Sequence, residues 1–228
     1  VLIWPLVQVT IFTLIFSQIM GARLPGNSDT YAYSVYLVAG VVPWTAFANT
    51  ISRVTTVFLD KKHILSKVRL SMPLLASYIV LSEAVTFAVT MAVFLMYLIA
   101  FGHPLGAGIL FVPLIFVLQQ VLAFSIGLIC ACLIVFIRDV KEIVGIVLQL
   151  WFWFTPIVYV ADIVPEGIRG WLELNPSMLF IESYHQIFVH GGMPVLDDMV
   201  TLAVTGGVLL AASLLMLSAL ERDIRDFL

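Results

Sequence analysis

The sequence predicts an all-α, polytopic membrane protein with six transmembrane helices. Of its 228 residues, 62% are apolar and only 11% are charged, whereas a soluble domain carries about 25% charged residues. The mean hydropathy is +1.11, and apolar stretches long enough to cross a bilayer recur along the chain. So few charges cannot cover a surface that faces water. Because backbone in lipid must satisfy its own hydrogen bonds, we expect these stretches to be helical.

Short polar segments separate the apolar stretches and give the expected order of elements. The six predicted spans are Val1–Met20, Tyr31–Thr56, Pro73–Ala100, Ile109–Ile137, Ile143–Tyr159 and Met199–Leu220. The fifth has 17 residues, roughly 25 Å as a helix, about enough to cross the hydrocarbon core. Pro43 and Thr155–Pro156 mark the two most prominent bends. Val1–Ala22 lacks a basic beginning, so we interpret it as a span rather than a signal peptide.

The lysines and arginines predict the orientation of the spans. Nine of the eleven fall near the loop 57–72, in the segment 138–142 or in the tail: Arg53, Lys61, Lys62, Lys67, Arg69, Arg138, Lys141, Arg222 and Arg225. Arg23 and Arg169 are the exceptions. Because lysine and arginine concentrate in cytoplasmic loops, we expect those segments and both termini on the cytoplasmic side.

Segment Val57–Met72 is the most basic loop. Its apolar residues Ile64, Leu65 and Val68 recur at helical spacing, and Asp60 is placed to cap a first turn. The composition favours a basic loop held at the lipid headgroups. The alternative is a short cytoplasmic helix that docks into a partner and transmits force.

Segment Val160–Asp198 is too long for a turn and too polar for a span. Pro165 can start one short helix, and Asn175 followed by Pro176 is a typical cap and first turn of a second. Apolar residues recur at three- and four-residue steps from 179 to 188. We therefore expect two short helices that dip into the outer leaflet or lie on it. The pattern leaves open whether they form a gate or a static interfacial anchor.

Ionisable and metal-binding residues are sparse inside the spans. Glu83 lies about ten residues into the third span, roughly 15 Å deep, where an ionisable group is a functional candidate. No second acid lies as deep in another span, which favours a structural interhelical hydrogen bond over a proton relay. Cys130 and Cys132 stand in an apolar run and are expected to pack rather than bind metal.

The sequence contains no cofactor motif. The four histidines lack metal-binding spacing, and no glycine-rich phosphate loop is present. We expect neither a metal nor a cofactor in this chain and no nucleic acid as its partner. If ATP drives its work, another chain must bind the nucleotide.

Four segments, in this order, carry a family resemblance: YLVAGVVPWTAF, DKKHILSKVRL, FIRDVKEIVGIVLQLWFWFTPIVY and LNPSMLFIESYHQIFV. Together they resemble the membrane-spanning permease subunit of ABC-2 type polysaccharide exporters, and most closely the O-antigen polysaccharide permease. The resemblance covers nearly the whole chain, and RDVKEI with FWFTPIVY is its most specific part. It implies that residues 1–228 form a single ABC-2 type transmembrane domain.

The resemblance implies that this chain works together with other molecules: a second copy of itself, an ATPase and a lipid-linked polysaccharide. Such permeases are homodimers in the bacterial inner membrane, in contact with membrane lipid and with two copies of a separate ABC ATPase that binds MgATP. They export undecaprenyl-linked polysaccharide to the periplasm, for lipopolysaccharide biosynthesis, through a channel at the dimer interface. The permease itself is not an enzyme. The family normally begins with an interfacial amphipathic helix before the first span, which contributes to the ATPase contact and the lateral gate; the sequence opens after that helix.

The resemblance also assigns roles to residues and favours the coupling and gate interpretations. It assigns to the coupling helix the residues Asp60, Lys61, Lys62, His63, Lys67 and Arg69. It assigns to the periplasmic gate the residues Trp171, Asn175, Pro176, Phe180 and Tyr184.

Aromatic side chains suit a sugar channel, because many weak stacking contacts hold a polymer and still let it slide. Our channel candidates are Tyr33, Tyr36, Trp44, Phe47, Trp151, Phe154 and Tyr159. The alternative for some of them is an interfacial aromatic belt.

Three rival functions are weaker. An ABC-2 exporter of capsular polysaccharide, teichoic acid, a drug or a lipid would look much the same in sequence. A secondary transporter or channel should carry paired buried charges or inverted repeats, and neither is visible. An intramembrane enzyme would need several catalytic groups at one depth, and Glu83 alone does not supply them.

Overall fold

The computed structural model describes Val7, residues 32–65 and 71–160, Gly167, Gly170, Leu172 and residues 174–227. The regular elements are α2 (Ala32–Asp60), α3 (Lys62–Leu65), α4 (Met72–Ala100), the 3₁₀ helix η2 (Ala107–Phe111), α5 (Val112–Ile134), α6 (Val140–Trp153), α8 (Pro176–Phe188) and α9 (Leu196–Phe227). The all-helical prediction is therefore confirmed for the described residues. The first predicted span and the beginning of the helix expected at Pro165 lie outside them.

Four helices in the described part of the chain are long and apolar enough to cross a membrane. They are α2, α4, the continuous η2–α5 and α9. They correspond to the second, third, fourth and sixth predicted spans. The total of six spans remains a prediction.

The fifth predicted span ends earlier than expected. Helix α6 has 14 residues, roughly 21 Å, so it falls short of a hydrocarbon core of about 30 Å. After Trp153 the chain turns through 154–159 instead of continuing as a helix. Pro156 explains the stop, because proline lacks an N–H and disfavours helical backbone at the residue before it. The predicted bend at Thr155–Pro156 is confirmed, whereas a helix that reaches Tyr159 is wrong.

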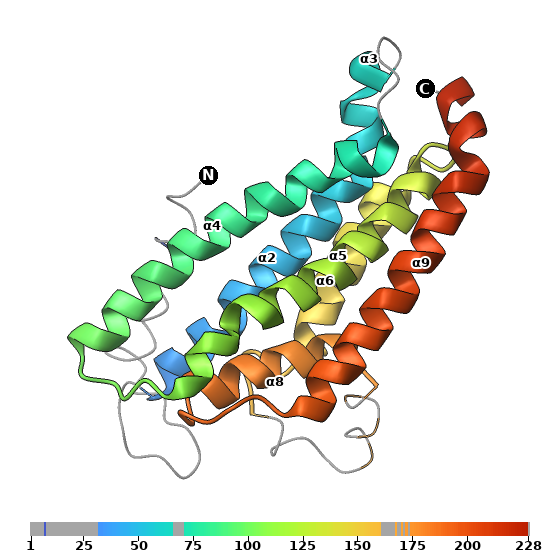
Figure 1. The fold of residues 1–228 in the computed structure, drawn as a ribbon. Coiled ribbons are helices and arrows are strands. Elements are labelled where there is room, and N and C mark those ends of the chain that lie inside the picture. Colours follow the sequence, from blue (N-terminus) through green and yellow to red (C-terminus); the bar gives the residue numbers. More distant parts are fainter. Residues whose placement is uncertain are drawn as a thin grey trace.

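Helices α2 and α5 form the centre of the bundle, with α4 packed along α2 and α9 along α5 (Figure 1). Helix α2 is buried on nearly every side and continues through Pro43. Gly127 of α5 allows the two central helices to approach closely, because a Cβ there would lie 2.8 Å from the Cβ of Val54. The large core joins residues of α2, α4, α5, α8 and α9.

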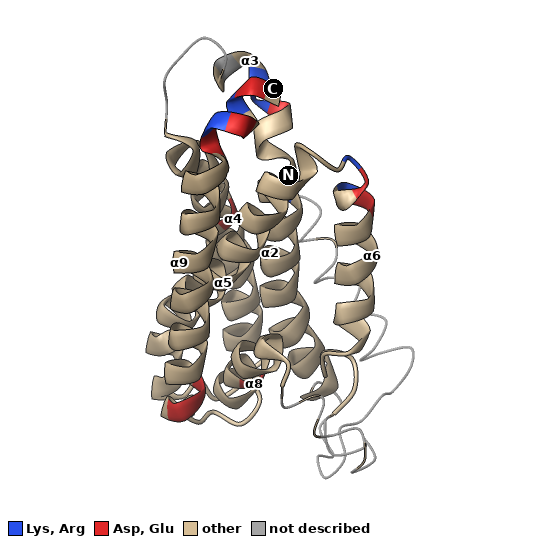
Figure 2. Ribbon diagram, turned by 90° about the vertical axis from the view of Figure 1, so that its right-hand side faces the viewer, with Lys and Arg blue, Asp and Glu red and all other residues tan. Residues whose placement is uncertain are grey.

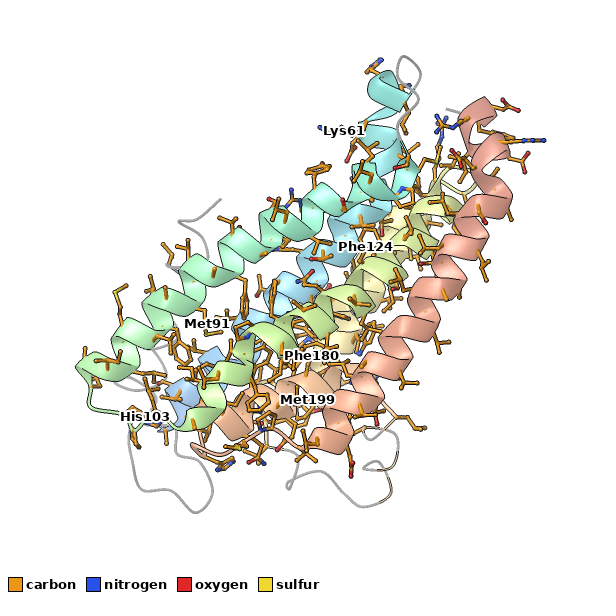
Figure 3. The ribbon with its side chains drawn as sticks, viewed as in Figure 1. Lys61, Met91, His103, Phe124, Phe180 and Met199 are labelled. Carbon is orange, nitrogen blue, oxygen red and sulfur yellow. The ribbon has the colours of Figure 1, made fainter. Side chains whose placement is uncertain are left out.

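Helix α8 crosses one end of the bundle, between the central helices and α9 (Figure 1). Phe180, Ile181 and Tyr184 are completely buried, so α8 is inserted into the bundle rather than lying on its surface. Figure 3 places Phe180 and Met199 at this end and Lys61 at the opposite one. Burial of this kind does not fit a helix that lies on the interface, and the gate role of α8 stays a prediction.

The two ends of the bundle differ in charge. Figure 2 shows lysine and arginine gathered at α3, at the start of α6 and at the end of α9, at the end away from α8. Acidic residues alone mark the start of α9 at the opposite end, where Asp197 and Asp198 lie. Three basic segments far apart in sequence thus meet at one end, as the predicted orientation requires.

Two loops contact each other at the α8 end through the backbone of glycine residues. A Cβ added to Gly106 would collide with the carbonyl oxygen of Gly191, and one added to Gly108 would collide with that of Gly192. His103 reinforces the contact, because its Nε2 lies 2.8 Å from the carbonyl oxygen of Phe188. These contacts fix the start of η2 to the end of α8.

Candidate functional site

An aromatic cluster joins α2, α6 and α8. The Trp151 ring meets Phe47 edge-on at 5.5 Å and Trp44 at 6.2 Å between centroids. Phe180 of α8 lies 5.1 Å from Phe47, and Phe152 of α6 lies 5.9 Å from Trp44. Tilted and edge-to-face pairs of this kind contribute about 0.5–1.5 kcal/mol each beyond the burial of their surface. The cluster therefore fixes how the three helices pack.

A polar junction lies beside the aromatic cluster and consists of Trp151, Thr155, Asn175 and Ser177. The Trp151 indole N–H donates to Asn175 Oδ1 at 2.7 Å, and Ser177 donates to the same oxygen from its backbone N–H at 3.0 Å and its hydroxyl at 2.6 Å. Asn175 Nδ2 donates to Thr155 Oγ1 at 3.0 Å. The hydroxyls of Thr155 and Ser177 are 2.8 Å apart. The end of α6 and the start of α8 are thus hydrogen-bonded to each other.

The segment 154–160, which follows α6, is tied to the start of α2 by tyrosine hydroxyls. Tyr36 Oη lies 3.0 Å from the carbonyl oxygen of Pro156 and 2.9 Å from that of Tyr159. Tyr33 donates to the carbonyl oxygen of Val158 at 2.8 Å. These bonds satisfy carbonyl groups that the interrupted helix leaves without a helical partner.

His185 of α8 is buried against Tyr36, with ring centroids 3.8 Å apart. Its Nε2 lies 3.1 Å from the Tyr36 carbonyl oxygen, which can only accept, so Nε2 carries the proton. Burial away from water lowers the pKa of His185 to about 3, although the hydrogen bond to Tyr36 opposes this effect. His185 is therefore neutral at physiological pH and holds α8 against α2.

An open apolar groove of about 560 Å³ borders the junction. Its lining consists of Val147, Leu150, Trp151, Phe154, Leu172, Leu174, Asn175 and Pro176. The polar groups of these side chains are the Asn175 amide and the Trp151 indole N–H, which are hydrogen-bonded to each other. A surface of this composition suits apolar chains or the flat faces of rings rather than ions.

The predicted channel residues do not share one exposed wall. Tyr36, Trp44 and Phe47 are buried within the chain, whereas Phe154 is 62% exposed. Three of the aromatic candidates, Trp44, Phe47 and Trp151, form the cluster described above. Tyr33 and Tyr36 hold the segment 154–160 against the start of α2. Tyr159 lies within that segment, and its Oη donates to the Trp153 carbonyl oxygen at 3.0 Å.

The predicted coupling residues lie at the charged end. Asp60 is the last residue of α2 and accepts a hydrogen bond from Thr56, four residues earlier in the same helix. Lys62 and His63 are exposed on α3, and Lys61 lies over the ring of Tyr78, 5.8 Å from its centroid. Lys67 and Arg69 lie outside the described residues, and so does the gate candidate Trp171.

The predicted gate residues on α8 are all placed. Asn175 caps the helix through the backbone N–H of Ser177, and Pro176 occupies its first turn, so this predicted helix start is confirmed. Phe180 and Tyr184 are completely buried. Sequence reasoning missed Thr155, Ser177 and His185, because single polar residues in an apolar pattern carry no signal for their distant partners.

Glu83 pairs with Arg53 across the α2–α4 contact. The Arg53 guanidinium lies 2.5 Å from Glu83 Oε1, and the Glu83 side chain is only 4% exposed. Arg53 also donates to the Ser82 hydroxyl at 3.3 Å. The structural interpretation of Glu83, a paired carboxylate between helices, is therefore confirmed.

Comparisons with known proteins agree on one family. The family model described as ABC-2 type transporter matches residues 1–189. Two relatives from Klebsiella pneumoniae named O-antigen export system permease protein RfbA are 28% and 26% identical; the first match covers 82% of this chain and 70% of the relative, the second 98% and 84%. A relative of the same name from Myxococcus xanthus is 27% identical, over 92% of this chain and 79% of that protein.

Proposed function

Because the chain belongs to the ABC-2 type transporter family, we propose that it exports lipid-linked polysaccharide of the O-antigen type from the cytoplasm to the periplasm. The observation that carries the proposal is the match, over most of the chain, to relatives named as O-antigen export permeases. As an ABC-2 permease the chain is a transmembrane transport subunit. Another cargo, such as capsular polysaccharide or teichoic acid, is the alternative.

In the proposed exporter, two copies of this chain pair in the bacterial inner membrane and enclose the path between them. Each copy contributes a single domain with six spans and both termini in the cytoplasm. Two copies of a separate ABC ATPase bind MgATP, and this chain needs no cofactor of its own. The gathering of basic segments at one end of the bundle supports a cytoplasmic assignment of that end.

The coupling function belongs, in this proposal, to α3 and the residues around it. The exposed side chain of Lys62 is available to a partner, His63 is exposed beside it, and Lys67 and Arg69 follow in sequence. Helix α3 continues α2 after a single residue, and α2 packs against α4, α5 and α8. A push on α3 therefore reaches the centre of the bundle.

The gate function belongs to α8 and the segment before it. Helix α8 is inserted between the central helices and α9 at the end away from the basic residues, where an exit to the periplasm would lie. Aromatic side chains around its start would line the path of the sugar, with Phe154 and Trp151 next to the open groove. The buried side chains of Trp44 and Phe47 support the side chains that would line this path.

Co-purification and reconstitution with the ATPase test the proposed function. We expect the chain and its ATPase to co-purify, and undecaprenyl-linked O-antigen polysaccharide to raise the rate of ATP hydrolysis severalfold. Stimulation by teichoic acid or a drug, with no response to O-antigen polysaccharide, would contradict the proposed cargo. An active export that needs no ATPase would contradict the proposed mechanism.

A further inference from the structure

Asn175 makes more contacts than a helix cap requires. An N-cap side chain needs to accept one backbone N–H, and the Ser177 N–H fulfils that need. Three further bonds connect Asn175 to the end of α6: one from the Trp151 indole, one to Thr155 Oγ1 and a longer one, 3.4 Å, to the Phe154 carbonyl oxygen. These three contacts add nothing to the capping of α8, so they call for another explanation.

The hydrogen-bond partners fix the orientation of the Asn175 amide. The Trp151 indole and the Ser177 backbone can only donate, and the Phe154 carbonyl can only accept. Oδ1 must therefore face the donors and Nδ2 the carbonyl. Thr155 has one hydroxyl proton, for which the Trp151 carbonyl oxygen and Ser177 Oγ, both 2.8 Å away, compete, while Ser177 donates to Asn175 and Asn175 donates to Thr155. The fixed amide orientation means that the bonds from Trp151 and to Thr155 both hold the end of α6 to Asn175.

Helix α6 is otherwise loosely held. Of its 14 residues only Val140 and Leu148 are buried, and Ile146, Leu150 and Trp153 are each more than half exposed. Its first turn lies at the charged end and its last turn at the junction (Figure 2). A helix held mainly at one end can shift as a rod and carry that shift to the element it is joined to.

We propose that Asn175 is a positioning residue that joins α6 and the start of α8 into one lever. A displacement of α6 at the charged end then moves α8 at the other end. This inference rests on the proposed function and adds the residue through which the gate is driven. The aromatic cluster packs the helices together, and the directional hydrogen bonds of the junction add one fixed register between α6 and the start of α8.

Variants that cut the junction but leave the α8 cap intact separate positioning from folding. Trp151→Phe removes the indole donor, and Thr155→Val removes the hydroxyl, while Asn175 still accepts from Ser177. The matched control is Thr90→Val on α4, because Thr90 is also buried and bonds a carbonyl of its own helix, that of Thr86. Asn175→Ala cuts both the junction and the cap.

The first measurement is the amount of polysaccharide exported per ATP hydrolysed by the full transporter in vesicles. We expect Thr155→Val to lower this ratio at least fivefold while ATP hydrolysis stays within twofold of wild type, and Trp151→Phe to lower the ratio as well. Asn175→Asp, which can accept but no longer donates to Thr155, should give an intermediate loss. Thr90→Val should leave the ratio unchanged. An unchanged ratio in both junction variants would overturn the proposal.

The second measurement follows the distance between α6 and α8 and does not depend on the cargo. Spin labels at Ile146→Cys and Glu182→Cys, with Cys130 and Cys132 replaced by serine and alanine, report this distance in nanodiscs. We expect a single narrow distribution that MgATP leaves unchanged in wild type and that broadens in Thr155→Val. A narrow distribution in Thr155→Val, or independent movement of the two helices in wild type, would overturn the lever. If wild type fails to export polysaccharide but keeps the narrow distribution, the proposed function fails and the junction stands.

Discussion

The two ends of the bundle are built in different ways. At the charged end several of the described side-chain hydrogen bonds are local: Thr56 bonds Asp60 and Arg225 bonds Glu221, each four residues apart. At the α8 end they join distant segments, such as His185 with Tyr36, which are 149 residues apart. Local contacts add little to how distant segments are held together, whereas long-range contacts hold several segments in one shape. Under the proposed function, the charged end would receive the ATPase and the α8 end would respond to it.

Removal of an aromatic from the cluster at the α8 end should have the largest effect on stability. Phe47→Ala would leave a cavity at a completely buried position, and such changes cost about 3–5 kcal/mol. Phe154→Ala is the control, because Phe154 is 62% exposed and its loss should cost less than about 1 kcal/mol. Unfolding in detergent monitored by circular dichroism measures both. Equal losses for the two variants would mean that the cluster is not what holds this end together.

The pair of Arg53 and Glu83 joins two helices in the half of the bundle toward the charged end, unlike the local contacts there. Its removal should have the second-largest effect on stability. Glu83→Ala leaves Arg53 without its carboxylate, and breaking a buried pair costs about 3 kcal/mol or more. Arg53 is 39% exposed, which should reduce the loss toward about 2 kcal/mol. The double variant Arg53→Met with Glu83→Leu should recover much of it. Export after this repair would show that no proton needs to pass through Glu83.

Acidification should weaken the α8 end. Because burial lowers the pKa of His185 to about 3, the folded state stays neutral where the unfolded state takes up a proton. Stability is therefore complete above the ordinary pKa of about 6.5 and falls as the pH drops toward 3, by at most about 1.4 kcal/mol per pH unit. Unfolding followed between pH 7 and pH 5 measures this slope. His185→Phe should remove the His185 contribution, whereas His63→Gln at the charged end should retain it.

Changes at the charged end should have the smallest effect on folding. Arg225→Ala removes a pair that is four residues apart on an exposed helix, worth about 0.3–0.5 kcal/mol. Lys62→Ala should likewise leave the unfolding temperature unchanged within about 1 °C. The proposed coupling role predicts that Lys62→Ala instead weakens binding of the ATPase, measured by co-purification at increasing salt. If Lys62→Ala lowered the unfolding temperature and left ATPase binding unchanged, the charged end would serve the stability of the fold, contrary to the comparison between the two ends.

The sequence predicted the features that depend on local pattern. Composition and hydropathy identified four of the long helices, and the Asn175–Pro176 pair identified the start of α8. The apolar run through Tyr159 concealed the end of α6, because hydropathy does not register that Pro156 stops the helix.

Contacts between distant segments could not be predicted in the same way. The bond from Trp151 to Asn175 and the pair of Arg53 with Glu83 depend on which helix faces are brought together. For the same reason the sequence could not tell that Trp44 and Phe47 are buried within the chain while Phe154 is exposed. Residue type and depth alone do not determine the direction in which a side chain points.

The glycine contact between the loops around Gly106 and Gly191 has a practical consequence for protein engineering. An epitope tag or a fluorescent protein inserted there would act as a wedge, because no room exists for a single methyl group. The turn at Gly102 offers a better location on the same face, since nothing stands within 4 Å of where its side chain would begin. Reporters at the α8 end of the bundle are therefore best placed a few residues before the contact rather than within it.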